Sequence, residues 1–158
     1  GIRKSFFVSA TVSLIVLPFL TFVKARGNIL LFTDSDCILD YYWINEMTKP
    51  FEENNVAGVQ GRYKTKQKQI ISQFEQIEIE NSYRKMEIIG NIDSIGTYSA
   101  AYNKKIFSKF NGYNEKYKKA SGEDFELSYR ISNSGYRLVF NKNAIFNVFI
   151  CILSYGNN

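Results

Sequence analysis

An apolar run that ends in acids, followed by alternating strand-like and helix-like pieces, most constrains the fold of this chain. The run NILLFTD occupies 28–34, and a short apolar run of this kind predicts a buried strand whose C-terminal end carries polar residues. Ligands of open α/β sheets gather at that end of the strands. NVAGVQGRY at 55–63 suits a second strand. The alternation of such runs with helical patterns predicts an α/β fold in one domain.

Three helices are predicted between and after these strands. Asp40 can cap a helix that continues through Met47 and stops before Pro50, because proline disfavours helix in the residue that precedes it. A second, amphipathic helix is predicted from Lys66 to Met86. Its apolar positions are Ile70, Ile71, Phe74, Ile77 and Met86. A third is predicted over 123–135, with Leu127 and Ile131 on one face and Gly135 as its stop, before a strand YRLVFN.

Residues 5–23 form a 19-residue stretch without a charged side chain, flanked by Arg3 and Lys4 on one side and Lys24 and Arg26 on the other. That length just spans a bilayer. Three interpretations remain open: a membrane helix, a secretory signal whose polar beginning has been trimmed, and an apolar segment buried in the fold. A second apolar stretch, AIFNVFICIL at 144–153, is too short to span and suits a buried strand, an interfacial segment or an altered C-terminus.

The composition excludes several kinds of chemistry. Histidine is absent, so neither Ser-His-Asp catalysis nor a zinc site of the HExxH type is available. Cys37 and Cys151 are the only thiols, and they are interpreted as small buried hydrophobes. The net charge of +5 suits anionic partners such as nucleotides, lipid phosphates or membrane surfaces. No nucleic-acid motif accompanies that charge, so nucleic acid is not predicted as a partner. Catalysis must rest mostly on carboxylates.

Two acidic clusters are the candidate site residues. Asp34 and Asp36 stand two apart at the end of the first strand, where both can approach one Mg²⁺ or Mn²⁺ ion through hard oxygen ligands. The alternative is a solvated turn in which an acid caps the next helix. Glu123 and Asp124 lie on the first turn of the third helix, where the helix dipole alone also explains acids.

The two clusters belong to segments that resemble family 2 glycosyltransferases in sequence and in order. These segments are ARGNILLFTDSDC at 25–37, GTYSAAYNKKIFSKFNGYNEKY at 96–117 and GEDFELSYRISNSGYRLVFNKNA at 122–144. The resemblance implies the GT-A fold, a mixed sheet with helices on both faces, and transfer with inversion at the sugar carbon. It covers about residues 24–145. The predicted organisation is an apolar segment at 1–23, which is a possible membrane helix or an altered N-terminus, a catalytic region at 24–146 and a tail at 147–158.

The resemblance also implies roles for individual residues. Asp34, Ser35 and Asp36 match the DxD motif that binds the metal and the nucleotide-diphospho-sugar, with Mg²⁺ or Mn²⁺ as cofactor. Asp124 matches the catalytic base of the ED motif. Three further residues match the acceptor side: Gly96, Thr97 and Glu123. The implied partners are a nucleotide-sugar donor and a glycan or lipid-linked acceptor, with a membrane-associated catalytic region facing the cytoplasm and a role in surface glycan or cell wall synthesis.

Departures from the family pattern leave alternatives open. Members usually carry a complete nucleotide-binding half before the DxD strand and a His after the last matched strand, and processive synthases carry QxxRW; this chain has none of these. One alternative is therefore an inactive, truncated remnant that binds a membrane or a partner. Another is a phosphatase of the haloacid-dehalogenase kind, although Cys37 and Ile38 stand where that chemistry needs a Gly-Thr pair.

Overall fold

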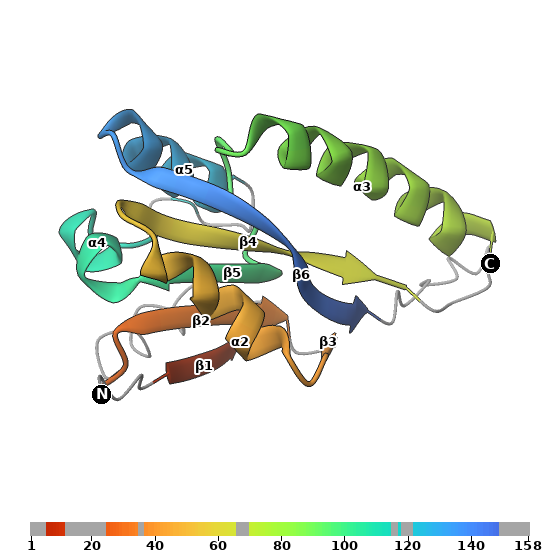
Figure 1. Cartoon of the computed structure of the whole chain (residues 1–158), viewed down its shortest axis with the longest axis horizontal. Helices are drawn as coiled ribbons and strands as arrows, with labels where there is room; N and C mark the ends of the chain where they lie inside the picture. The colour runs from red at the N-terminus through yellow and green to blue at the C-terminus, as the bar shows by residue number, and fades with distance from the viewer. Residues whose placement is uncertain are drawn as a thin grey trace.

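The computed structural model describes residues 6–11, 25–34, 37–65, 70–114, 117 and 122–148, without the side chains of 6–11, Ile71, Glu75 and Val148. Within these ranges six strands form one mixed sheet in the order β1-β2-β5-β4-β6-β3 (Figure 1). The strands are β1 (Phe6–Thr11), β2 (Ile29–Asp34), β3 (Cys37–Leu39), β4 (Val56–Lys64), β5 (Ser99–Asn103) and β6 (Arg137–Val148). The helices are α2 (Trp43–Thr48), α3 (Ile70–Ile89), α4 (Lys104–Lys109) and α5 (Glu123–Asn133), with a 3₁₀ turn η1 at Lys49–Glu52.

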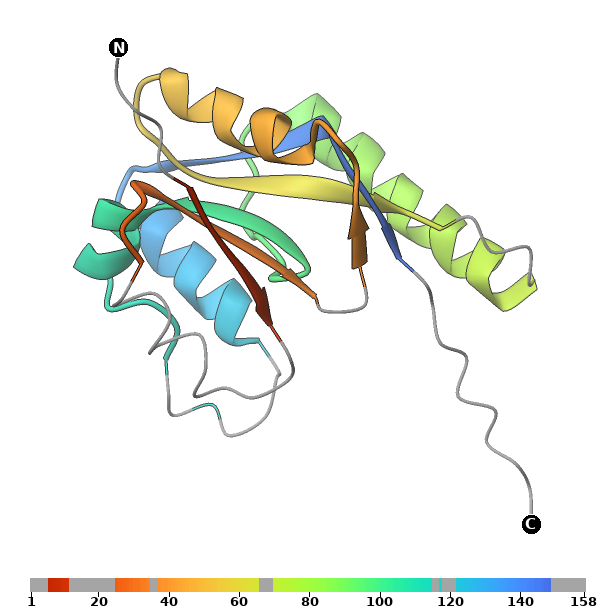
Figure 2. The ribbon, with the colours of Figure 1, turned by 90° about the horizontal axis from the view of Figure 1, so that it is seen from below.

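Parallel and antiparallel pairs alternate irregularly across the sheet. β1 runs parallel to β2, and β4 runs parallel to β6. The central strand β5 is antiparallel to both of its neighbours, β2 and β4. The short edge strand β3 is antiparallel to the end of β6. Figure 2 shows α2 on one side of the sheet and α4 and α5 on the other, which confirms the predicted mixed sheet with helices on both faces.

Successive residues of the central strands supply two separate cores. In β2, Leu30 and Phe32 belong to the cluster under α4 and α5, whereas Ile29 and Leu31 belong to the cluster under α2. The period of two follows from the pleat, which sends neighbouring side chains to opposite faces. On the α5 side Leu127 and Ile131 are fully buried, and on the α2 side Trp43 and Met47 are. Both faces of the sheet are therefore covered.

Most predicted elements are confirmed, with small shifts at their ends. The strand at 28–34 is β2, the strand at 55–63 is β4, and the helix over 123–135 is α5. That helix ends before Gly135, whose φ of +84° is the left-handed conformation of a helix stop. The strand predicted at YRLVFN continues to Val148, with Ala144 and Phe146 buried in the core. This supports the buried-strand interpretation for the first part of 144–153.

The predicted Asp40 cap is displaced by two residues. α2 starts at Trp43, and Tyr42 occupies the N-cap position without a capping side chain. Asp40 instead accepts a hydrogen bond from the Tyr42 amide at its Oδ1, at 3.0 Å, and one from the Trp43 amide at its carbonyl. The carboxylate therefore stabilises the turn that leads into the helix. The α-helix ends at Thr48, ahead of Pro50 as predicted.

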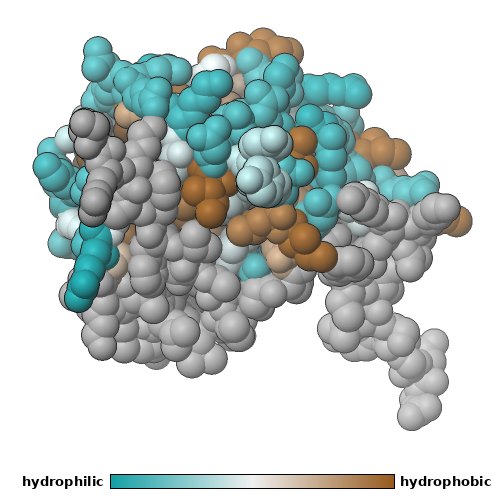
Figure 3. Space-filling model, turned by 60° about the horizontal axis from the view of Figure 1, so that its bottom comes forward, coloured by the Kyte–Doolittle hydropathy of each residue, from teal (hydrophilic) through white to brown (hydrophobic). Residues whose placement is uncertain are grey.

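Most of the apolar face predicted for the long helix is wrong, although Met86 does pack against the core cluster that contains Leu127 and Ile131. Ile70, Phe74 and Ile77 are 86%, 60% and 60% exposed, whereas Tyr83 is 1% exposed and packs on Phe140 with ring centroids 5.0 Å apart. The sheet surface beneath α3 carries polar groups, so polar side chains of α3 face it. Gln76 accepts a hydrogen bond from the Thr65 amide at 2.9 Å, and Glu80 pairs with Arg62. Figure 3 shows apolar patches among the hydrophilic residues of one face.

The N-terminal apolar stretch is described only at Phe6–Thr11. These residues form strand β1, in register with Ile29–Asp34 of β2. The rest of 5–23 lies outside the described residues, as does 149–153. Among the helices that the structure describes, none combines the length and the apolar composition needed to cross a bilayer.

One close approach in the sheet depends on a glycine. A Cβ atom at Gly61 in β4 would lie 2.2 Å from Ser99 Oγ, 2.9 Å from the Ala144 carbonyl oxygen and 2.9 Å from Met47 Sδ. These atoms belong to β5, β6 and α2, so a residue with a side chain at position 61 would push three elements apart. Gly61 therefore allows α2 to pack closely on the sheet.

The Arg62–Glu80 pair makes the stability depend on pH. The hydrogen bond from Arg62 is the main reason that the pKa of Glu80 lies below its usual value. A lowered pKa in the folded state contributes stability above the unfolded-state pKa of about 4.3, and that contribution is lost as the pH falls through the folded-state pKa. We expect Glu80→Gln to lower the free energy of unfolding by about 1 kcal/mol at pH 7 and by much less near pH 3. Denaturant titrations at both pH values measure this, with Glu78→Gln, an exposed acid of α3, as the matched control.

Candidate active site

Asp34 lies at the C-terminal end of β2. Thr33 pairs with Ser99 in the antiparallel β2–β5 ladder, so Asp34, the last residue of β2, lies beside the segment Gly96–Tyr98 that leads into β5. Asp34 is partly buried. The other two residues of the predicted metal and diphosphate site, Ser35 and Asp36, lie outside the described residues.

The second acidic cluster occupies the first turn of α5, as predicted. Gly122 is the N-cap and has φ +87°, a left-handed conformation that residues with a side chain adopt only at a cost. Glu123 and Asp124 follow, both partly exposed. Asp124 Oδ1 accepts a hydrogen bond from the Phe125 amide at 2.9 Å, which orients its carboxylate. The glycine thus sets the direction in which the chain enters the helix that carries Asp124.

Three tyrosines from other parts of the chain lie within reach of the charge of Asp124. Burial raises the pKa of Tyr98, Tyr102 and Tyr113, and the negative charge of Asp124 raises each of them further. Tyr98 precedes β5, Tyr102 lies within it, and Tyr113 follows α4. Tyr98 is also the residue that comes next to the Thr33–Ser99 pair, on the side where Asp34 leaves β2. The end of β2 therefore lies beside Tyr98, and the charge of Asp124 also acts on Tyr98.

The predicted acceptor residues Gly96 and Thr97 belong to the same segment as Tyr98, just before β5, and are partly buried. The Gly96 amide donates a hydrogen bond of 2.6 Å to Gln60 Oε1. The preceding amide, of Ile95, donates one of 3.0 Å to Ser128 Oγ. Asp34 therefore lies beside the segment that contains Gly96 and Thr97. The first turn of α5, which carries Glu123 and Asp124, is tied to Ile95 at the start of that segment through Ser128.

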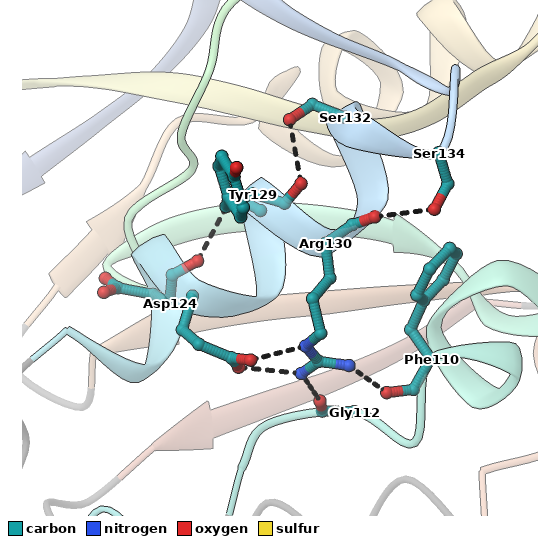
Figure 4. A network of polar contacts seen from close by, with 9 residues as sticks. Phe110, Gly112, Asp124, Tyr129, Arg130, Ser132 and Ser134 are labelled. Atoms are coloured by element: carbon teal, nitrogen blue, oxygen red, sulfur yellow. Dashed lines mark hydrogen bonds and ion pairs between the residues drawn. The ribbon is translucent and has the colours of Figure 1, made fainter.

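The helix α5 is held against the turn after α4 by Arg130 (Figure 4). Its guanidinium donates to both carboxylate oxygens of Glu126, at 2.6 and 2.9 Å, to the Gly112 carbonyl at 2.8 Å, and to the Phe110 carbonyl. A planar fork of this kind makes several bonds with one fixed geometry. Arg130 therefore fixes the direction of the helix that presents Asp124.

Among the described side chains, no group of three or more His, Cys, Asp and Glu residues lies close enough to hold a metal ion. A Mg²⁺ or Mn²⁺ ion with a diphosphate does not require such a group, since it takes one or two carboxylates and fills its remaining positions with phosphate and water. The partly buried carboxylate of Asp34, at the end of a strand, suits that donor set.

Sequence reasoning missed the polar residues that hold the site from beneath. Gln60 is a single amide in the apolar strand VAGVQG, and Ser128 is a hydroxyl next to Leu127 on the buried face of α5. Both are almost fully buried, at 1% and 0% exposure. One signal in the sequence could have revealed them: each is a polar residue at a position where the periodicity predicts a buried apolar one. A buried polar group requires a hydrogen-bond partner, so such a residue points to a specific contact.

A mixed sheet covered on both faces, with acids at the end of β2 and on the first turn of α5, is the arrangement that the resemblance to GT-A glycosyltransferases predicts. The model for glycosyl transferase family 21 matches residues 19–151, and the chain belongs to that family. The resemblance seen in the sequence is thus confirmed at the level of a GT-A glycosyltransferase, with family 21 as the matching family, and this assignment argues against the phosphatase alternative. No curated protein sequence matches the chain.

Solved structures support the same fold. One is the mannosyltransferase PcManGT from Pyrobaculum calidifontis in complex with GDP-Man and Mn²⁺, with a TM-score of 0.66 and 14% sequence identity. Another is GalNAc-T7 with UDP, GalNAc and Mn²⁺, with a TM-score of 0.65 and 13% identity. Each match covers 86% of this chain but only 36% and 30% of the other chain. The described protein therefore corresponds to about a third of either neighbour.

The Arg130 fork gives a stability prediction. Lysine keeps the charge but supplies a single ammonium group that cannot bond Glu126, Gly112 and Phe110 together. We expect Arg130→Lys to lower the free energy of unfolding by about 1–3 kcal/mol. Arg137→Lys, which changes a more exposed arginine paired with Glu53, should cost less than about 0.5 kcal/mol. Urea denaturation compares them, and equal costs would show that the fork contributes nothing of its own.

Proposed function

We propose that this chain carries the catalytic region of an enzyme that moves a sugar from a nucleotide-diphospho-sugar to an acceptor hydroxyl, with inversion and with the assistance of a metal ion. The observation that carries the proposal is that β2 and α5 border one segment of the chain: Thr33 pairs with Ser99, and Ser128, which bonds the Asp124 carbonyl, accepts a hydrogen bond from the Ile95 amide. Membership of a glycosyltransferase family supports it. So do two structural neighbours whose complexes hold nucleotide or nucleotide sugar with Mn²⁺.

The proposed reaction is a single displacement with two acidic groups at its two ends. The acceptor O–H gives its proton to the carboxylate of Asp124, and the oxygen forms a bond to the anomeric carbon. The bond from that carbon to the diphosphate breaks on the opposite side, and the nucleoside diphosphate leaves with the electron pair. Glu123, Gly96 and Thr97 are assigned to the acceptor side, where they orient the hydroxyl toward Asp124.

The leaving side is assigned to Asp34, Ser35 and Asp36. A bound Mg²⁺ or Mn²⁺ ion would neutralise the charge that develops on the departing diphosphate. Asp34 would hold this ion with Asp36, and Ser35 would contact the diphosphate. The donor is a GDP-sugar or a UDP-sugar by analogy with the two neighbours.

The setting we propose is synthesis of a surface glycan or glycolipid at a membrane, with the catalytic region on the cytoplasmic side. Apolar residues at both ends of the chain and the net charge of +5 support membrane association. The chain spans only about a third of the length of its structural neighbours. That this chain catalyses the transfer without further segments is therefore itself proposed. An inactive remnant that still binds a membrane or partner is the competing possibility.

The first test concerns the base. Asp124→Asn keeps the size of the side chain and its acceptor for the Phe125 amide but removes the basic carboxylate. We expect a loss of about 10²–10⁴-fold in turnover, the usual contribution of a general base, with donor affinity unchanged. Release of nucleoside diphosphate from GDP- and UDP-sugars in the presence of Mn²⁺ measures it. Glu78→Gln on α3 is the control, and an Asp124→Asn protein as active as the parent would remove the proposed base.

The second test concerns the metal. We expect chelation with EDTA to abolish turnover, and added Mn²⁺ or Mg²⁺ to restore it. Asp34→Asn should weaken Mn²⁺-dependent binding of a nucleoside diphosphate by about tenfold or more, because it removes one charged ligand. Calorimetry with GDP or UDP, with and without Mn²⁺, reports binding even in a chain without turnover. Equal nucleotide affinity with and without the ion would contradict the assignment and favour the remnant.

A further inference from the structure

The two consecutive amides of Ile95 and Gly96 are each held by a buried side chain from a different element. Ser128 on α5 accepts from the Ile95 amide at 3.0 Å, and Gln60 on β4 accepts from the Gly96 amide at 2.6 Å. The segment that leads to Thr97 is therefore fixed from the helix on one side and from the sheet on the other.

Ser128 also reaches the residue proposed as the base. Its hydroxyl donates a 2.7 Å hydrogen bond to the carbonyl oxygen of Asp124, one helical turn earlier. A serine that bonds back to its own helix is common. This serine in addition accepts from Ile95, so one hydroxyl joins the first turn of α5 to the segment before β5. With a donor and an acceptor both occupied in a fully buried position, its orientation is fixed.

Gln60 is held just as firmly. Its amide nitrogen donates to the Ser99 carbonyl at 3.0 Å and to the Gly61 carbonyl at 2.9 Å. Three hydrogen bonds to a 1% exposed amide leave it no alternative rotamer of similar energy. Gly96 itself is required by the same packing, because a Cβ atom there would lie 2.5 Å from the ring of Tyr98.

We propose that Ser128 and Gln60 are positioning residues, which fix the distance between the acceptor segment Gly96–Thr97 and Asp124 by holding the Ile95 and Gly96 amides. The roles of Asp124 and of Gly96–Thr97 rest on the proposed function, whereas the link between the two segments rests on the hydrogen bonds alone. Neither side chain is assigned contact with a substrate. Their effect on the reaction is through the alignment of the acceptor hydroxyl with the base.

Amide hydrogen exchange on the whole chain tests the link without any ligand. In Ser128→Ala we expect the Ile95 amide to exchange about tenfold or more faster, together with the Glu126 amide, which bonds the Gly122 carbonyl in the first turn of α5. In Gln60→Met the Gly96 amide should exchange faster while the Glu126 amide keeps the parent rate. Thr48→Ala is the matched control: it removes a buried hydroxyl that bonds only its own helix, to the Asn45 carbonyl. It should leave both segments within about twofold of the parent.

Turnover tests the consequence for the reaction. We expect Ser128→Ala to lower kcat by about tenfold with the KM for the donor unchanged, and Ser128→Thr, which keeps a hydroxyl, to recover most of it. A change of exchange confined to Ile95, or an unchanged kcat in Ser128→Ala and Gln60→Met, would overturn the proposal. If the parent releases no nucleoside diphosphate at all, the proposed function fails, and the exchange experiment alone decides whether Ser128 joins the two segments.

Discussion

Burial of the central strands on both faces is the constraint on which the rest of the structure depends. β2 and β5 direct alternate apolar side chains into two cores, one on each face of the sheet. Both faces must therefore be shielded from water by helices. The helices that satisfy this need are α2 on one side and α4 with α5 on the other (Figure 2). Covering the second face is also what brings α5 against the segment that leads into β5. The chemistry of the site thus depends on a packing requirement.

The site itself is built from backbone segments that buried polar side chains hold in place. Arg130 ties α5 to the turn at Phe110 and Gly112, and Ser128 ties the same helix to Ile95. Buried polar groups lower the stability little when every hydrogen bond is made. When one partner is removed, the stability falls strongly, because the remaining polar group stays buried with neither a protein partner nor water. The carboxylates of Asp34 and Asp124, by contrast, stay partly accessible. The buried hydrogen bonds hold the backbone of the site in place, and the carboxylates proposed to react remain accessible to substrate.

The sequence was sufficient to predict elements whose pattern is local. β2, β4 and α5 were predicted because an apolar run or a 3.6-residue period marks each, and Gly135 ends α5 as expected. Most of the apolar face of α3 was predicted wrongly, because Ile70, Phe74 and Ile77 are exposed and only Met86 packs against the core. The sheet beneath the helix instead presents Arg62, which pairs with Glu80. Gln60 and Ser128 were missed because their partners are 36 and 33 residues away. No local pattern reveals a hydrogen bond of that separation.

The contacts around Gly61 have a consequence for how the sequence can vary. Alanine, the smallest alternative, would already meet groups from β5, β6 and α2 at once, so no single neighbour can relax to admit it. Position 61 should therefore accept almost no replacement in a saturation library, while the exposed Ile70 of α3 should accept nearly any. The tolerance of a position to substitution would then depend on how closely atoms of neighbouring helices and strands surround it. It would depend little on whether the native side chain is polar or apolar.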